Sequence, residues 1–325
     1  MNISKRIFIR YSLSLAAPTA LVEYASAQTS YPNKPIHLIV PFAPGQVTDW
    51  LARFIGEQMA SELKQPVLVE NKAGLNGTIG NAYAVTQPAD GYTLVITSNG
   101  THAAAPSLFK KLGYDPIKSF TQIGSLMSLP WMLMVKPDFP AKNFEEFLSY
   151  ARANPGKLNI GYGSSSSQLC IHLLRTLGKV DILSIPYKGL GQTVVDVRAG
   201  LLQATFLDMG SAMAQHTQGG LRGIAVTSPS RSSIIPTVPA ISETLPGYAM
   251  TSWLALGAPS GTPSSVTSQL YTVLSKILSK PENKQKIAAY GGDVVMLNGD
   301  QVTALIQSES PMWAKFARES GIQPE

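Results

Sequence analysis

The stretch that decides the fold is residues 36–49, IHLIVPFAPGQVTD, which continues into WLARFIGEQM at residues 50–59. Its first five residues are apolar apart from one histidine, which predicts a short strand buried in a sheet. Two prolines then end the strand, and Gly45 permits a tight turn. Thr48 or Asp49 is expected to cap the helix that follows, whose apolar residues recur three and four positions apart. The free N–H groups at this helix start can bind a carboxylate, although an ordinary strand-to-helix turn has the same pattern.

The first 27 residues have the features of a secretory signal peptide. Three basic residues precede an apolar segment at residues 11–22, and Ala-Ser-Ala at 25–27 is typical of a cleavage site. A membrane anchor is the weaker alternative, because the apolar segment is short and contains two serines and a proline. We therefore expect an exported protein of the periplasm, cleaved after Ala27, with no later membrane-spanning segment.

The composition is that of a globular protein of about two domains, with 325 residues, 44% of them apolar and 14% charged. The formal net charge of +6 falls to +4 without residues 1–27, which carry three positive charges and one negative charge. The basic residues are dispersed, so we expect no nucleic-acid partner. The single cysteine, Cys170, excludes an intramolecular disulfide, and its apolar surroundings predict a buried thiol rather than a reactive one.

Strand, polar loop and helix alternate along the chain, which predicts doubly wound α/β architecture with parallel sheets. A first module has expected strands at 36–40, 66–70 and 92–97, and a second has them at 158–162, 182–187, 203–207 and 221–227. Apolar segments at 126–135 and 251–258 are expected to cross between the modules. The remainder, at 265–278, 281–290 and 300–320, is expected to be helical.

The second module is therefore inserted between an early and a late part of the first. We expect a discontinuous domain 1 at residues 28–127 and 254–325, and domain 2 at residues 128–253. Two crossing strands between them form a hinge, and this geometry suits closure around a ligand.

The sequence carries no pattern that favours catalysis or metal binding. Its four histidines are isolated, so no metal-ligand spacing occurs, and no G-x-S-x-G or P-loop motif is present. The serine run at residues 164–167 lacks an obvious partner base, and Asp49 and Asp208 are as well explained as helix caps. We expect a protein that is not an enzyme and has no cofactor and no metal.

The loops expected at the strand ends are instead rich in uncharged hydrogen-bond donors. Neutral donors, helix N-termini and water can hold an anion without leaving a buried charge unpaired when the site is empty. Polar residues are common in loops in any case, so no single loop decides the question. The donors are Gln46, Thr48, Asn76, Thr78, Ser98, Asn99, Thr101 and residues 164–168.

A series of short motifs recurs in a family order along the mature chain. They are Tyr31-Pro-Asn-Lys-Pro-Ile, Val40-Pro-Phe-Ala-Pro-Gly, Thr48-Asp49, Gln65-Pro-Val, Glu70-Asn71, Gly77-x-x-Gly80, Asp90-Gly-Tyr-Thr-Leu, Tyr114-Asp-Pro, Asn154-Pro-Gly-Lys157, Pro186-Tyr-Lys-Gly189, Ala225-Val-Thr-Ser228 and Pro246-Gly247. On these motifs the chain resembles the Bug family, the extracytoplasmic solute receptors of tripartite tricarboxylate transport systems.

The resemblance implies a type II periplasmic binding protein: two doubly wound α/β domains joined by a two-strand hinge around a central cleft. It implies a small carboxylate ligand, held by the first strand-to-helix loop largely through bridging waters, and transient contact with integral membrane transporter subunits. We expect the receptor to be a monomer. Carried over by position, the implied ligand-binding residues are Phe42, Ala43, Pro44, Gly45, Gln46, Val47, Thr48, Asp49, Asn76, Gly77, Thr78, Ser98, Asn99, Thr101, His102, Ser164, Ser165, Ser166, Ser167, Gln168 and Asp208.

Two positions depart from the family pattern. The family usually continues the first Pro-Gly with two more glycines, where this chain has Gln46 and Val47, and it often has a histidine where Leu169 stands. The first change adds bulk and an amide to the expected pocket, so we expect this loop to take part in ligand selection. Gln46→Gly is expected to change which ligands bind and to leave the stability nearly unchanged.

Three functions are compatible with the sequence. The first is a binding protein that delivers a small organic carboxylate to a membrane transporter. The second is a ligand-binding receptor of a two-component signalling system, and the third is a secreted hydrolase that uses one of the serines at 164–167.

Overall fold

The computed structural model describes residues 31–187, 190–322 and 324, and the expected signal peptide at 1–27 lies outside this range. The chain from Pro32 onward forms one compact unit. Among the described helices, none combines the length and the apolar character needed to cross a membrane.

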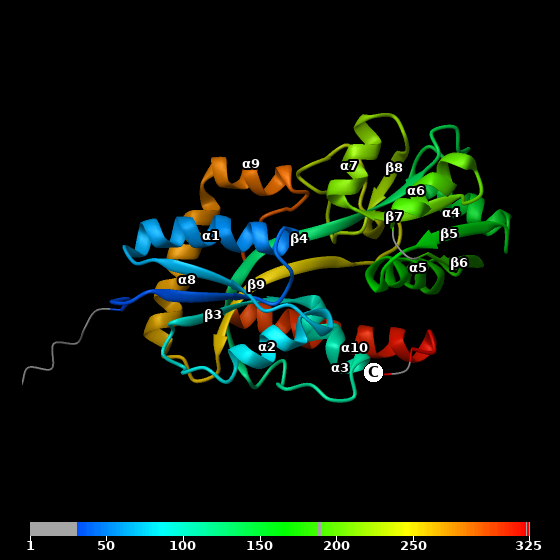
Figure 1. Cartoon of the computed structure of the whole chain (residues 1–325). Helices are drawn as coiled ribbons and strands as arrows, with labels where there is room; N and C mark the ends of the chain where they lie inside the picture. Colours follow the sequence, from blue (N-terminus) through cyan, green and yellow to red (C-terminus); the bar gives the residue numbers. More distant parts are fainter. Residues whose placement is uncertain (1–30, 188–189, 323, 325) are drawn as a thin grey trace, which may run out of the picture. The chain divides into compact units, whose positions relative to one another are not determined.

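The first lobe is built on the sheet that the opening strand joins (Figure 1). Strand β1 (Ile36–Val40) lies between the parallel strands β2 (Val67–Asn71) and β3 (Thr93–Ser98), and β3 pairs with the antiparallel strand β9 (Thr251–Pro259). Its other elements are α1 (Val47–Leu63), η1 (Leu75–Gly77), α2 (Thr78–Ala84), η2 (Gly100–Ala104), α3 (Ala105–Leu108), α8 (Ser264–Ser279) and α9 (Pro281–Ala289).

The second lobe repeats this pattern with a second sheet. Strand β5 (Leu158–Tyr162) pairs in parallel with β6 (Ile182–Pro186) and β7 (Ala204–Asp208), and β8 (Arg222–Val226) completes the sheet. Its helices are α4 (Phe144–Ala153), α5 (Ser165–Gly178), α6 (Leu190–Ala199), α7 (Met209–Thr217) and the short η3 (Ile241–Glu243).

Strand β4 (Phe120–Val135) belongs to both sheets. Up to Pro130 it pairs with β9, and from Trp131 onward it pairs with β7 and β8. A proline has no backbone N–H, so its position where the strand changes partners costs no ladder hydrogen bond within either sheet. In Figure 1, β4 and β9 run side by side between the lobes, as expected of two hinge strands.

The last long helix, α10 (Gly299–Glu319), contacts both lobes. Trp313 and Phe316 are buried in the same apolar cluster as Phe147 and Ile171 of the second lobe. His172 Nε2 lies 3.0 Å from Glu319 Oε2 at the end of the helix. The domain boundaries expected from the sequence remain a prediction, but residues assigned to domain 1 share a core with domain 2.

Three helix starts differ from the expectation. Helix α1 begins at Val47 after Gln46, so neither Thr48 nor Asp49 is its cap. Asn99 is already helical, and α5 starts within the serine run, with Ser164 as the cap and Ser167 completing a capping box. At α5 the Ser164 hydroxyl accepts from Ser167 N and so satisfies one free N–H group of the first turn, whereas Gln46 gives α1 no side-chain cap.

Helix α7 is present in the structure but was not predicted from the sequence. It has only two fully buried residues, Met209 and Ala212, so its periodic signal is weak, and Asp208 caps it by accepting from Ser211 N at 3.0 Å.

Glu309 links α10 to the hinge. Its Oε2 accepts a hydrogen bond of 2.9 Å from Trp253 Nε1 on β9, and burial raises the pKa of the Glu309 carboxyl to about 7. Between the ordinary pKa of 4.5 and 7, the folded protein keeps a proton that the unfolded chain releases. The contribution of Glu309 to stability is therefore present in full below pH 4.5 and is lost as the pH rises to 7, a loss of about 3 kcal/mol.

We expect Glu309→Gln to abolish this fall, because the amide oxygen still accepts from Trp253 but cannot ionise. Urea unfolding at pH 5 and pH 8 measures it: the wild type should lose stability between the two, and the variant should not. Glu145→Gln, at an exposed position of α4, is the control and should behave like the wild type. Equal pH dependence in the wild type and Glu309→Gln would contradict the assignment.

Candidate functional site

A cavity of about 300 Å³ lies where the carboxyl ends of β1 and β3 meet the hinge strands. Its walls come from the first strand-to-helix loop, the start of η2, the middle of β9, the crossing point of β4, the end of β7 and the end of α9. The lining residues are Phe42, Val47, Thr48, Ser98, Asn99, Gly100, Leu129, Trp131, Asp208, Ser252, Trp253, Leu254 and Tyr290.

Six of the ligand-binding residues that the sequence predicts are in the lining of this cavity, and they come from three separate segments. They are Phe42, Val47, Thr48, Ser98, Asn99 and Asp208. The others lie outside the lining: Ala43, Pro44, Gly45, Gln46, Asp49, Asn76, Gly77, Thr78, Thr101, His102, Ser164, Ser165, Ser166, Ser167 and Gln168.

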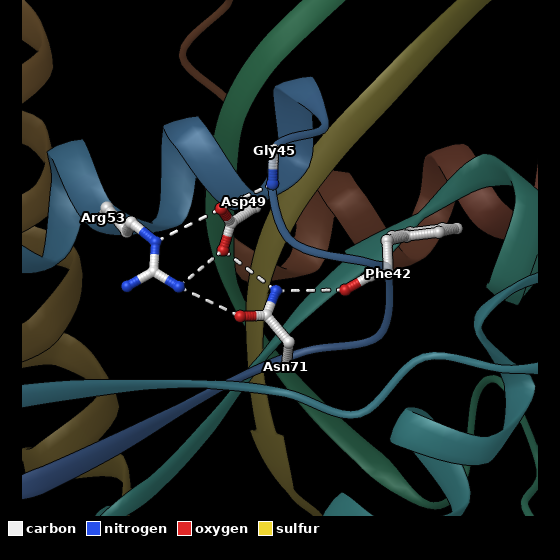
Figure 2. Close-up of polar contacts among 5 residues, drawn as sticks. All are labelled: Phe42, Gly45, Asp49, Arg53 and Asn71. Carbon is white, nitrogen blue, oxygen red and sulfur yellow. Dashed lines mark hydrogen bonds and ion pairs between the residues drawn. The ribbon is translucent and has the colours of Figure 1, made fainter.

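The first loop is shaped by the buried carboxylate of Asp49 (Figure 2). One oxygen accepts from Gly45 N at 3.0 Å and Arg53 Nε at 3.2 Å, and the other accepts from Asn71 Nδ2 at 2.9 Å. The same Asn71 amide donates to Phe42 O at 3.0 Å. Asp49 therefore joins both ends of the loop to β2, both of its carboxylate oxygens accept from donors of the protein, and the residue is outside the cavity lining.

Charge pairing keeps this carboxylate ionised. The hydrogen bond from Arg53 lowers the pKa of Asp49 to about 2, and the bonds from Gly45 and Asn71 act in the same direction against the effect of burial. Arg53 is itself committed to Asp49 and Asn71, whose Oδ1 accepts from Nη2 at 3.0 Å. The arginine nearest the loop is thus used to build it.

The donors that face the cavity are uncharged. Val47 and Thr48 occupy the first turn of α1, whose N–H groups have no intrahelical acceptor and lie at the positive end of the helix dipole. The Thr48 hydroxyl has no hydrogen-bond partner among the described residues, although the side chain is buried. Asn99 donates to Thr251 O at 3.3 Å, which holds its amide against β9.

The opposite walls are mainly aromatic and carry one acid. Trp131 Nε1 donates to Ser252 Oγ at 3.3 Å, which orients the ring, and Tyr290 stacks on Trp50 of α1 with ring centroids 3.6 Å apart. Asp208 uses Oδ1 for the α7 cap. None of the lining residues is a lysine, arginine or histidine.

The glycine-rich segment after β2 supports the cavity from behind. A Cβ on Gly77 would lie 2.8 Å from Thr101 Cγ2 and 3.1 Å from Phe42 Cζ, so the absence of a side chain lets the Phe42 ring pack there. Asn76 is exposed and adopts a φ of +52°, and Thr78 caps its own turn through Leu75 O at 2.8 Å.

His102 and the serine run are occupied by structural contacts. Burial lowers the pKa of His102 to about 3, its ring packs against Phe120, and Nδ1 lies 2.9 Å from Thr101 Oγ1. Ser164 and Ser167 bond to each other at the start of α5, with their Oγ atoms 3.1 Å apart. Cys170 is fully buried, as expected, and burial raises the pKa of its thiol.

Sequence reasoning missed the hinge and α9 contributions: Leu129, Trp131, Ser252, Trp253, Leu254 and Tyr290. The crossing strands themselves were expected, so their apolar residues were available as candidates. Which of them face the cavity depends on the β4–β9 register, which shifts twice between Gln122 and Met127.

Comparisons with known proteins agree with this geometry. The model of the "Tripartite tricarboxylate transporter family receptor" matches residues 51–322. Protein BugT of Bordetella pertussis is 30% identical over 99% of both chains. The structure of R. palustris Rpa4515 with adipate is 30% identical, with a TM-score of 0.71 over 91% of this chain and 100% of that chain. The periplasmic binding protein BugD is 31% identical, with a TM-score of 0.67 over 91% of this chain and 100% of that chain.

Two α/β lobes joined by crossing strands, with a small cavity at the hinge, define a solute-binding receptor. The chain belongs to the tripartite tricarboxylate transporter receptor family. The resemblance to the Bug family and the type II periplasmic binding protein fold are confirmed.

We expect Asp49→Ala to weaken ligand binding indirectly, because Asp49 holds the first loop in place and is not in the cavity lining. The variant leaves the donors on Gly45, Arg53 and Asn71 without an acceptor, which should cost about 1–3 kcal/mol of folding stability. Without these hydrogen bonds the first loop should lose its fixed shape, and carboxylate affinity measured by calorimetry should fall more than tenfold. Asp90→Ala, in the turn at the amino end of β3, is the control and should bind like the wild type; unchanged affinity in Asp49→Ala would contradict the role given to this residue.

Proposed function

We propose that this receptor captures a small organic monocarboxylate with an apolar or aromatic body and delivers it to a tripartite tricarboxylate-type transporter. The observation that carries the proposal is the chemistry of the cavity lining. Neutral donors gather at the start of α1, aromatic side chains cover the other walls, and no lysine, arginine or histidine is among the lining residues.

One carboxylate can be held at this helix start. The first-turn N–H groups, the Thr48 hydroxyl and the amide of Asn99 supply hydrogen bonds, and the helix dipole favours a negative charge. A second ligand carboxylate would approach Asp208, which faces the cavity from the other lobe. Like charges close together repel, so additional carboxylates should weaken binding.

The apolar walls select the rest of the ligand. Four aromatic side chains line the cavity, those of Phe42, Trp131, Trp253 and Tyr290, and burial of apolar ligand surface against them supplies affinity. The cavity is at the small end of the range for ligand sites, which favours a ligand of about one ring.

Transport remains the role that the family supports, with a sensing role as the second candidate. We propose export through residues 1–27 with cleavage after Ala27, action as a monomer, and transient contact with integral membrane subunits. A signalling receptor would use the same cavity, so deletion of the neighbouring transporter genes followed by uptake measurements separates the two roles. The serine hydrolase alternative receives no support from the paired serines at the start of α5.

The ligand class is tested by calorimetry of the purified receptor with benzoate, cyclohexanecarboxylate, adipate, malate and citrate. We expect the two ring monocarboxylates to bind at least tenfold more tightly than malate and citrate. The structure of the relative Rpa4515 is described with adipate and that of MatC with malate, so these acids are the informative competitors. Tighter binding of citrate or malate than of either ring acid would overturn the proposal.

The role of Asp208 is tested by Asp208→Asn. The amide can still cap α7 through its oxygen, but it no longer repels a second carboxylate. We expect adipate affinity to rise about tenfold and benzoate affinity to change less than threefold. Asp196→Asn, on α6, is the control and should leave both affinities unchanged.

A further inference from the structure

The segment between α9 and α10, residues 290–298, runs along the hinge strand. Asp293 and Ser128 exchange backbone hydrogen bonds of 2.8 Å in both directions. Further on, Ser125 N donates to Leu297 O at 3.0 Å, and Leu297 N donates to Ser125 Oγ at 2.8 Å. The α9–α10 segment is therefore fixed to β4 at both ends, on the part of β4 that also pairs with β9.

The side chain of Asp293 reaches the other lobe. Its Oδ2 accepts from Ser232 Oγ at 2.7 Å, and its Oδ1 accepts from Ser233 N at 3.2 Å and also from Ser233 Oγ. Both serines belong to the loop that follows β8 in the second lobe. Three donors from one lobe thus converge on one carboxylate whose backbone is held by the hinge.

A second contact between the lobes lies two residues earlier. Gly291 packs against the first turn of α7: a Cβ at this position would lie 2.5 Å from Gly210 N and 3.0 Å from Gly210 Cα. The φ of Gly291 is +82°, which residues with a side chain rarely adopt. Only a glycine allows the two backbones to approach this closely.

Between these contacts and α9 lies Tyr290, a wall of the ligand cavity. Its ring stacks on Trp50 of α1 at an interplanar angle of 18°. Tyr290 is adjacent to Gly291, and Asp208 is separated from Gly210 by one residue. The contact between Gly291 and Gly210 therefore brings together the two chain segments that carry Tyr290 and Asp208, one from each lobe.

We propose that Asp293 and Gly291 are positioning residues that hold the two lobes around the cavity and keep Tyr290 in its wall. Neither residue lines the cavity, so their effect is on how long the lobes stay together. The proposal rests on the proposed function, since it assigns the closed arrangement to ligand retention. Loss of these contacts raises the rate of ligand release and does not slow ligand entry.

The first test is Asp293→Asn, with benzoate as the probe in stopped-flow binding. The amide keeps the size of the side chain but loses the charge and half of its acceptors. We expect the dissociation rate to rise at least tenfold and the association rate not to fall. Asp115→Asn is the matched control, because Asp115 accepts from Ile117 N and Lys118 N in a turn before β4 rather than across the lobes.

The second test substitutes the serines that donate to Asp293. Ser232→Ala combined with Ser233→Ala removes two of the three donors, and we expect a similar rise in the dissociation rate. Adding Asp293→Asn to this pair should produce little further change, because all three substitutions remove one contact. Full additivity of the two effects, or a dissociation rate unchanged in both variants, would overturn the proposal.

The third test needs no ligand. Small-angle scattering of the full-length mature receptor should give a larger radius of gyration for Asp293→Asn and Gly291→Ala than for the wild type and Asp115→Asn. If the wild type binds no carboxylate, the proposed function fails, and scattering still decides whether these residues hold the lobes. If the radius is unchanged in both variants, the proposed positioning role fails even where benzoate binds.

Discussion

The structure depends on one continuous strand that neither lobe can form without. Strand β4 supplies an edge for β9 in the first sheet and for β7 and β8 in the second, so both sheets are completed by the same sixteen residues. Backbone pairing of this kind couples the lobes through one continuous strand that is hydrogen-bonded in both sheets. The change of partner at Pro130 places the crossing point beside the cavity, which explains why Leu129 and Trp131 line it.

In the first strand-to-helix loop, the charged side chains stabilise the loop itself, and the groups that line the cavity are neutral donors. Asp49 and Arg53 neutralise each other behind the loop, and Asn71 connects this pair to the Phe42 carbonyl. An arginine in the cavity would bind a carboxylate more strongly but would leave a desolvated cation when the site is empty. A transport receptor must release its ligand, so neutral donors at a helix start fit that requirement better.

Local patterns in the sequence predicted most helices and strands. They failed where contacts between residues far apart in the chain determine the structure. The strands at 36–40 and 158–162 were predicted to the residue, because buried apolar runs between turn residues are local signals. Residues 164–168 were expected to be a loop, but α5 starts at Ser165, since serines act as caps here without the usual glutamate. The cavity residue Tyr290 carries no local signal for its role, which comes from the contact of Gly291 with Gly210, 81 residues earlier in the chain.

Different residues are proposed to select the ligand and to retain it, and this division follows from their positions. Thr48, Asn99 and Asp208 line the cavity, whereas Asp293 and Gly291 contact the opposite lobe and lie outside the lining. A change in the first group alters the free energy of particular ligands, and a change in the second shifts the balance between open and closed states for every ligand alike. The two groups of residues can therefore be varied separately, the first to change ligand preference and the second to change ligand release.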